Sequence, residues 1–95
     1  MKPIYSRRAL ADLHRISDYY AVQASPAIAE AIGQRLAEVV DQFCQAPRSA
    51  PILPRRSKIR SVPVVNYPFR IFYRIRKDAV EIVHIRHTSR QPLKP

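Results

Sequence analysis

The sequence predicts an α+β fold with an N-terminal edge strand and an antiparallel helix hairpin packed on a small antiparallel sheet, in the order β-α-α-β-β-β. Two observations lead to this prediction. Apolar residues recur every three or four positions as far as residue 45, and from residue 59 they alternate every second position. Because 95 residues provide one core of modest size, we expect 1–95 to form a single domain.

The first helix is predicted to follow a short N-terminal strand. Residues 2–5 contain Pro3, which lacks a backbone N–H, so this strand can lie only at a sheet edge. Ser6 comes next and belongs to a residue type that commonly caps a helix N-terminus. Apolar side chains then recur at helical spacing, at Leu10, Leu13, Ile16 and Tyr20. This spacing is typical of an amphipathic helix with one buried face.

A second helix is predicted from Pro26 to about Gln45. Ser25 can cap it, and Pro26 suits the first helical position, where a missing N–H costs no hydrogen bond. The turn between the two helices is short, so we expect them to form an antiparallel hairpin. Gly33 lies inside the second helix, where glycine lowers helix stability, and we expect it to let the two helices pack closely.

Three strands are predicted after a basic, proline-rich surface loop over 47–58. The first, 59–65, contains Pro63 and is expected at a sheet edge or a bulge. The second, 67–76, carries Tyr, Phe or Ile at every odd position, which is the period of a strand. The third, 80–87, is apolar on both faces, which indicates a central strand.

The net charge of +10 comes entirely from the second half of the chain. Residues 1–46 hold five bases and five acids, whereas residues 47–95 hold twelve bases and two acids, Asp78 and Glu81. A field of this sign concentrates anionic partners such as nucleic acid, a membrane surface or an acidic protein. The alternative is a solvated basic surface that serves only solubility, but solubility does not require all the excess charge on one half.

Several kinds of site are excluded or disfavoured by the composition. The one cysteine, Cys44, cannot form an internal disulfide, and we expect it to be a small core residue. His84 and His87 lie three apart on a strand and point to opposite faces, so we expect no metal site. There is no glycine-rich loop, and we expect no cofactor. Without a secretory signal or a bilayer-spanning run, we expect a soluble cytoplasmic protein with no membrane contact.

The alternating strand predicts a basic outer face of the sheet. If the odd-numbered residues of 67–75 face the helices, arginines and one aromatic residue occupy the opposite face. The residues expected there are Arg70, Phe72, Arg74 and Arg76, joined by Arg60 from the preceding strand and by His84 or Arg86 from the following one. Arginine suits phosphate and carboxylate groups because its planar fork makes two parallel hydrogen bonds. Each of these arginines could instead only solvate the open side of the sheet.

Three functions are compatible with such a face. Nucleic-acid binding would combine phosphate contacts with base stacking on Phe72 or Tyr67. RNA cleavage would need a base, cations on the scissile phosphate and an acid for the leaving oxygen. The side chains available for cleavage are Arg70, Arg74, Arg86, His87 and Arg90, and a paired carboxylate is missing because Glu81 is alone. Docking of an acidic protein would use the same positive field.

Several short segments occur in a particular order and spacing from Ile4 to about Pro92. They are Tyr5-Ser6 with Ala9, Asp12-Leu13, Ile16 and Tyr19-Tyr20; then Arg60-Ser61-Val62-Pro63-Val64; then Phe69-Arg70-Ile71-Phe72-Tyr73-Arg74; and Val83-His84-Ile85-Arg86-His87-Thr88-Ser89-Arg90. Together these segments resemble the RelE/ParE superfamily of bacterial toxins. The long helical hairpin and the His87-x-x-Arg90 ending are more similar to the ParE branch than to the RelE branch.

This resemblance implies the toxin of a type II toxin–antitoxin pair, held inactive in a hetero-oligomer by a small acidic antitoxin. ParE-like members poison DNA gyrase without chemistry of their own, and the target or partner contacts would then be Arg60, Arg70, Phe72, Arg74, Arg86 and Arg90. RelE-like members are enzymes that cut mRNA on the ribosome, often with a C-terminal tyrosine, and the catalytic residues would then be Arg70, Arg86, His87 and Arg90.

Gyrase inhibition is the preferred prediction of the two because the helical hairpin is long and no tyrosine follows Tyr73. Ribosome-dependent mRNA cleavage is the alternative, and a non-toxic nucleic-acid-binding module is a third.

Overall fold

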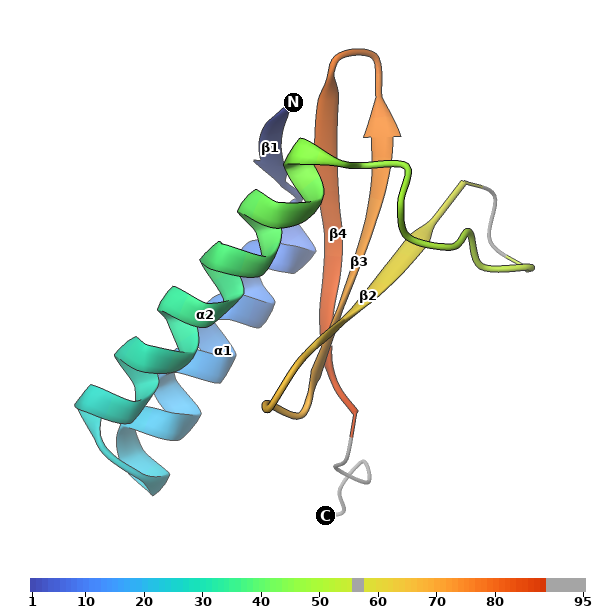
Figure 1. Cartoon of the computed structure of the whole chain (residues 1–95). Helices are drawn as coiled ribbons and strands as arrows, with labels where there is room; N and C mark the ends of the chain where they lie inside the picture. The colour runs from blue at the N-terminus through green and yellow to red at the C-terminus, as the bar shows by residue number, and fades with distance from the viewer. Residues whose placement is uncertain (56–57, 89–95) are drawn as a thin grey trace.

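Two antiparallel helices pack on one face of a four-stranded sheet in the computed structural model (Figure 1). The structure describes residues 1–55 and 58–88. The elements in chain order are β1 (Lys2–Tyr5), α1 (Arg7–Gln23), α2 (Pro26–Gln45), β2 (Arg60–Val64), β3 (Phe69–Arg76) and β4 (Ala79–His87). The predicted α+β fold and its element order are therefore confirmed.

The sheet has the strand order β1-β4-β3-β2, with β4 in the interior. β1 runs parallel to β4, and the other two pairs are antiparallel. The edge positions of β1 and β2 agree with the prolines they contain, Pro3 and Pro63, because neither residue can donate to a neighbouring strand. β4 is central as predicted, and β1 pairs with it only from Ala79 to Ile82.

Both helices begin at the predicted caps. The Ser6 hydroxyl accepts a hydrogen bond from the Ala9 backbone N–H at 3.0 Å, and the Ser25 hydroxyl accepts one from Ile28 at 3.1 Å. Each bond satisfies a donor that the first helical turn would otherwise leave unpaired. Pro26 occupies the first turn of α2, as expected from its fixed φ and missing N–H.

The buried face of α1 differs by one position from the predicted face. Leu10 is 46% exposed, whereas its neighbour Ala9 is fully buried and joins the core. The inward face of α1 therefore runs through Ala9 and Asp12, with Leu13, Ile16 and Tyr20 beside them. The small Ala9 side chain lets the helix approach the sheet at this point, which the apolar spacing alone does not reveal.

The core lies between α2 and the central strands. The rings of Phe43 on α2 and Tyr73 on β3 stack with centroids 4.0 Å apart. The Tyr73 hydroxyl donates to the Pro47 carbonyl at 2.7 Å, which ties the start of the long loop to the sheet. Burial raises the pKa of Tyr73. Cys44 is buried beside this cluster, as predicted for a core residue, and burial also raises the pKa of its thiol.

The expectation for Gly33 is wrong. A Cβ added at Gly33 would meet no atom within 4 Å, so the two helices do not approach closely there. Gly33 instead lies beside a groove between α1 and α2, on the exposed side of the hairpin. Gly33 therefore makes no close helix–helix contact possible, and its one effect on stability is the low helix propensity of glycine.

The described helices include none that is long and apolar enough to cross a lipid bilayer.

Candidate functional site

The outer face of the β3–β4 hairpin carries most of the predicted basic residues. The structure pairs Arg70 with Arg86, Phe72 with His84, and Arg74 with Glu81. Residues directly opposite one another in an antiparallel pair share a face of the sheet. The alternate residues of β3, from Phe69 to Tyr73, are buried toward the helices, so these three pairs lie on the opposite side.

Arg70 and Arg86 place two like charges directly across from each other. Neither guanidinium forms a salt bridge with any of the residues that the structure describes. Opposed like charges destabilise a strand pair. An anion between them would relieve this repulsion, and a carboxylate or phosphate can accept the parallel N–H bonds of a guanidinium.

Phe72 lies beside this arginine pair and makes two ring contacts. Its ring stacks on the His84 imidazole, with centroids 5.8 Å apart and an interplanar angle of 17°. The guanidinium carbon of Arg86 lies 5.0 Å from the Phe72 centroid, within the range of a cation–π contact. Arg86, Phe72 and His84 thus form one contiguous surface, and Arg70 lies opposite Arg86. These four residues are called the outer-face cluster below.

Arg74 differs from Arg70 because its charge is compensated. Its Nε donates to Glu81 Oε1 at 2.7 Å, and Arg76 Nη1 approaches the same oxygen at 3.5 Å. The hydrogen bond from Arg74 lowers the pKa of Glu81. Glu81 thus offsets part of the positive charge at this end of the face, whereas Arg70 and Arg86 at the other end have no carboxylate partner among the described residues.

Arg60 does not join this face, contrary to expectation. It pairs with Tyr73, whose side chain is buried toward the helices, so Arg60 shares that inner face. Its Nη1 donates to the carbonyl oxygens of Ala50 at 2.6 Å and Arg48 at 3.2 Å. Arg60 therefore holds the loop before β2 in place, which its position in an alternating strand did not indicate.

The four residues named for RNA cleavage are not brought together within the described chain. Arg70 and Arg86 lie on the outer face, whereas His87 pairs with the buried Phe69 and so lies on the other side of the sheet. The His87 ring makes an edge contact with Phe69 at 5.2 Å and lies 3.3 Å from the Tyr20 hydroxyl. Arg90 lies outside the described residues.

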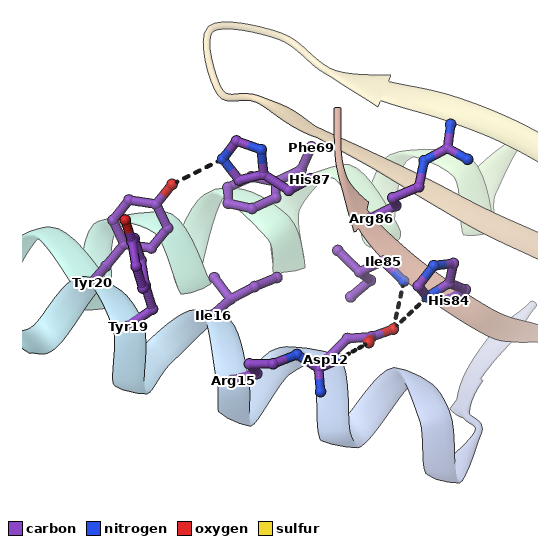
Figure 2. A pocket seen from close by; sticks show the side chains of 10 residues that line it. All are labelled: Asp12, Arg15, Ile16, Tyr19, Tyr20, Phe69, His84, Ile85, Arg86 and His87. Carbon is purple, nitrogen blue, oxygen red and sulfur yellow. Dashed lines mark hydrogen bonds and ion pairs between the residues drawn. The ribbon is translucent and has the colours of Figure 1, made fainter. Parts of the chain in front are cut away.

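Asp12 on α1 is a buried polar residue that the sequence analysis did not assign to the site. Its side chain is only 2% exposed. Oδ2 accepts the Ile85 backbone N–H at 2.9 Å and lies 2.7 Å from His84 Nδ1, while Oδ1 accepts from Arg15 (Figure 2). β1 has already ended at this point, so the carboxylate provides Ile85 with the acceptor that an edge strand would otherwise supply.

One signal in the sequence could have identified Asp12. It lies three residues after Ala9 and one before Leu13, on the buried face of an amphipathic helix. An acidic residue in that position is costly unless it is paired, so its presence indicates a specific partner. His84, the partner, is 72 residues away in the chain, and its identity required the structure.

The guanidinium groups of the outer-face cluster are of the kind that suits a carboxylate or phosphate, and the described residues contain no metal-binding arrangement. Among residues 1–55 and 58–88, no three His, Cys, Asp or Glu side chains lie close enough to hold a metal ion. The imidazole of His84 is engaged on both nitrogens, with Asp12 at Nδ1 and Arg8 Nη2 at 3.3 Å from Nε2.

Comparison with protein-family models identifies the family of this chain. Residues 4–92 match the model of the ParE toxin of type II toxin–antitoxin systems, parDE. The chain belongs to the ParE toxin family. No curated protein sequence matches it significantly.

Several solved structures share the fold of this ParE-family protein. A chain of the chromosomal ParDE system from P. aeruginosa is 27% identical, with 94% of this chain and 97% of that chain covered and a TM-score of 0.83. The isolated E. coli RelE toxin is 16% identical over 95% and 86% of the chains, with a TM-score of 0.60. The E. coli RelBE complex contains a chain that is 15% identical over 95% and 98%, also at 0.60. The resemblance to the RelE/ParE superfamily is thus confirmed.

Proposed function

We propose that this protein is a toxin that inhibits DNA gyrase by binding it, and that a cognate acidic antitoxin neutralises the toxin in a hetero-oligomer. The observation that carries the proposal is the match to the ParE toxin family over residues 4–92. The structural likeness supports the same branch, since the TM-score is 0.83 for the ParDE chain and 0.60 for RelE.

The arrangement of the basic residues favours binding over chemistry. Arg70 and Arg86 face away from the helices, His87 lies on the helix side, and both ring nitrogens of His84 are engaged. A general base must reach the proton that it removes, and it must act next to the cations that stabilise the phosphate. Within the described chain His87 lies on the other face from the two arginines, and His84, which lies beside them, has both ring nitrogens engaged. A surface that binds a target is therefore the simpler role.

The outer-face cluster is the proposed contact surface for the target. Arg70 and Arg86 offer two guanidinium groups that form no salt bridge within the described residues. Phe72, which contacts both Arg86 and His84, adds an apolar ring. Arginine and aromatic residues at the centre of an interface contribute most of its binding energy. A carboxylate of the target placed between the two arginines would gain bidentate hydrogen bonds and remove their mutual repulsion.

mRNA cleavage on the ribosome is the second proposal, and one observation favours it. Asp12 holds His84 by Nδ1 next to Phe72 and Arg86, which is the way a catalytic imidazole is commonly oriented. For His84 to take a proton from a ribose hydroxyl, Arg8 would have to leave Nε2. The phosphate would then lie on Arg70 and Arg86.

Expression in bacteria that lack the antitoxin tests both proposals in one experiment. The growth rate, the linking number of a reporter plasmid and the integrity of translated messages are measured together. We expect growth arrest and a relaxed plasmid with intact messages, because gyrase maintains negative supercoiling.

Arrested growth with normal supercoiling and cleaved messages would favour the ribonuclease over the gyrase inhibitor. Normal growth at a confirmed expression level would contradict both toxin proposals and favour a non-toxic binding module.

A further inference from the structure

The groove that Gly33 borders lies between α1 and α2 and has a volume of about 530 Å³. Apolar side chains of both helices line it, and it reaches the sheet at Tyr5 on β1 and Ile85 on β4. Ligand sites typically have volumes of about 300–1,000 Å³, and the space between packed helices is one of their common locations. The groove therefore has the size and the place in the fold of a small-molecule site.

Gly33 keeps the middle of this groove open. It lines the groove, and a Cβ at this position would meet no atom within 4 Å. Ala29 and Ala37, one turn before and one turn after it on α2, line the groove as well. Larger side chains at these positions would occupy the space. Since glycine lowers the stability of a helix and Gly33 makes no close contact with α1, what this glycine provides is room in the groove.

The groove is apolar inside and polar at its opening. Its apolar lining includes Leu36 and Val40, each only 2% exposed. The polar residues of the lining are all exposed, and they are His14, Ser17, Glu30 and Gln34. A bound molecule would therefore place an apolar part between the helices and a polar part at the opening.

Glu30 gives the opening of the groove a negative charge. None of the ion pairs within residues 1–55 and 58–88 involves Glu30, whereas the other two glutamates, Glu38 and Glu81, are each paired with arginine. No lysine or arginine of the described chain lines the groove. A cationic group in the groove would be matched by the Glu30 carboxylate, and the Ser17 hydroxyl and the Gln34 carbonyl are further acceptors in the lining.

We propose that this groove binds a small amphipathic amine, with its apolar body between α1 and α2 and its ammonium group at Glu30. The ammonium would form a charge-assisted hydrogen bond with the carboxylate, which is stronger than a bond between neutral groups. The apolar body would leave water and contact Leu13, Ile16 and Leu36. The inference goes beyond the proposed function and depends on neither gyrase nor an antitoxin.

The fluorescence of an indole amine tests the proposal, because the protein contains no tryptophan. The probe is tryptamine, titrated with the folded full-length protein at neutral pH. We expect saturable binding with a blue shift of the indole emission, since the indole leaves water. Indole-3-propionate carries a carboxylate in place of the ammonium and should bind about tenfold more weakly. The net charge of +10 by itself favours the anion, so the expected order of affinities requires a local carboxylate.

Matched variants of α2 locate the site. Gly33→Leu fills the groove, and leucine has a higher helix propensity than glycine, so a loss of binding cannot come from a weaker helix. Ala31→Leu places leucine at an exposed position outside the groove. Glu30→Gln removes the carboxylate of the groove, and Glu38→Gln removes one outside it.

We expect Gly33→Leu and Glu30→Gln each to weaken tryptamine binding about tenfold, and Ala31→Leu and Glu38→Gln by less than about twofold. Tryptamine should also raise the thermal unfolding midpoint of the wild-type protein and leave that of Gly33→Leu unchanged, because a ligand stabilises only the state that binds it.

Equal affinity of the wild-type protein and Gly33→Leu for tryptamine would overturn the proposal, and so would the absence of saturable binding. Indole-3-propionate that binds as tightly as tryptamine would overturn the assignment of an amine. Self-association in sedimentation velocity that Gly33→Leu abolishes would show that a second copy of the chain occupies the groove instead. None of these outcomes alters the plasmid supercoiling expected with the wild-type toxin, so the gyrase proposal is tested separately.

Discussion

At the scale of single residues, Asp12 connects the helical layer to the sheet. One carboxylate accepts the Ile85 N–H and holds His84 and Arg15, although it is almost completely buried. Hydrogen bonds to a charged group stabilise more than neutral ones, and an unpaired buried donor is costly. Asp12 thereby fixes the distance between α1 and the free edge of β4.

Replacing Asp12 should therefore lower the stability of the folded protein. We expect Asp12→Ala to lower the free energy of unfolding by about 3 kcal/mol, because the Ile85 N–H and the His84 ring lose their acceptor. Urea denaturation followed by circular dichroism measures this value. Asp18→Ala, at an exposed position of the same helix, is the control and should change stability by less than about 0.5 kcal/mol. Equal losses in the two variants would refute the role assigned to Asp12.

The lowered pKa of Glu81 predicts how the stability of the protein changes with pH. Its pKa is lower in the folded protein than its ordinary value of 4.5, because Arg74 donates a hydrogen bond to it. The ion pair of Glu81 with Arg74 therefore stabilises the fold fully above the pKa of Glu81 in the unfolded chain. This contribution is lost as the pH falls through the lower pKa of Glu81 in the folded protein.

The wild-type protein should consequently be more stable than Glu81→Gln at pH 7, and the difference should shrink as the pH falls from about 5 to about 2. Thermal unfolding midpoints of the two proteins across this range measure the effect. A difference that stays constant with pH would show that the ion pair with Arg74 contributes nothing measurable.

At the scale of elements, the period of the apolar residues predicted both helices and β3, and apolar residues on both faces predicted the central strand β4. Ser6, Ser25 and Pro26 predicted the helix starts because capping is a local interaction within one turn. Pro3 and Pro63 predicted the sheet edges for an equally local reason, their missing N–H groups. Features of this kind depend on a few consecutive residues, so one sequence is sufficient to predict them.

The position of side chains across elements was predicted less well. Arg60 was expected on the outer face, but its register with Tyr73 places it inward. A register shift between Phe72 and Tyr73 also brings Glu81 rather than Ile82 opposite Arg74. Strand register and bulges are set by pairing between distant segments, which alternation within one strand does not specify.

Gly33 gives a test at the element scale. Its surroundings are open, its φ is not positive and it lies in the middle of α2, so alanine should fit without strain. We expect Gly33→Ala to stabilise the protein by about 1 kcal/mol and to raise the unfolding midpoint by about 4–8 °C. Calorimetry measures the midpoint.

The reverse substitution on the same helix, Ala31→Gly at an exposed position, should destabilise by a similar amount. If Gly33→Ala destabilises instead, the helices approach each other more closely than the structure shows.

At the scale of the whole molecule, the neutral helical half supports a basic sheet. All of the +10 net charge lies after residue 46, yet the structure distributes it unequally. Arg74 and Arg76 share the single carboxylate of Glu81, and Arg60 faces inward, whereas Arg70 and Arg86 lie opposite each other with no carboxylate partner among the described residues. The composition therefore predicted an anionic partner. The ion pairs and the strand register show that Arg70 and Arg86 are the arginines of the outer face without a carboxylate partner among the described residues.

The central claim is that this surface inhibits gyrase by binding. Its most direct test is the supercoiling of relaxed plasmid by purified gyrase and ATP, with the toxin added at increasing concentration. We expect inhibition that the double variant Arg70→Ala and Arg86→Ala weakens about tenfold, while the matched variant Arg7→Ala and Arg48→Ala inhibits like the wild type. Unimpaired supercoiling in the presence of excess wild-type toxin would contradict the account.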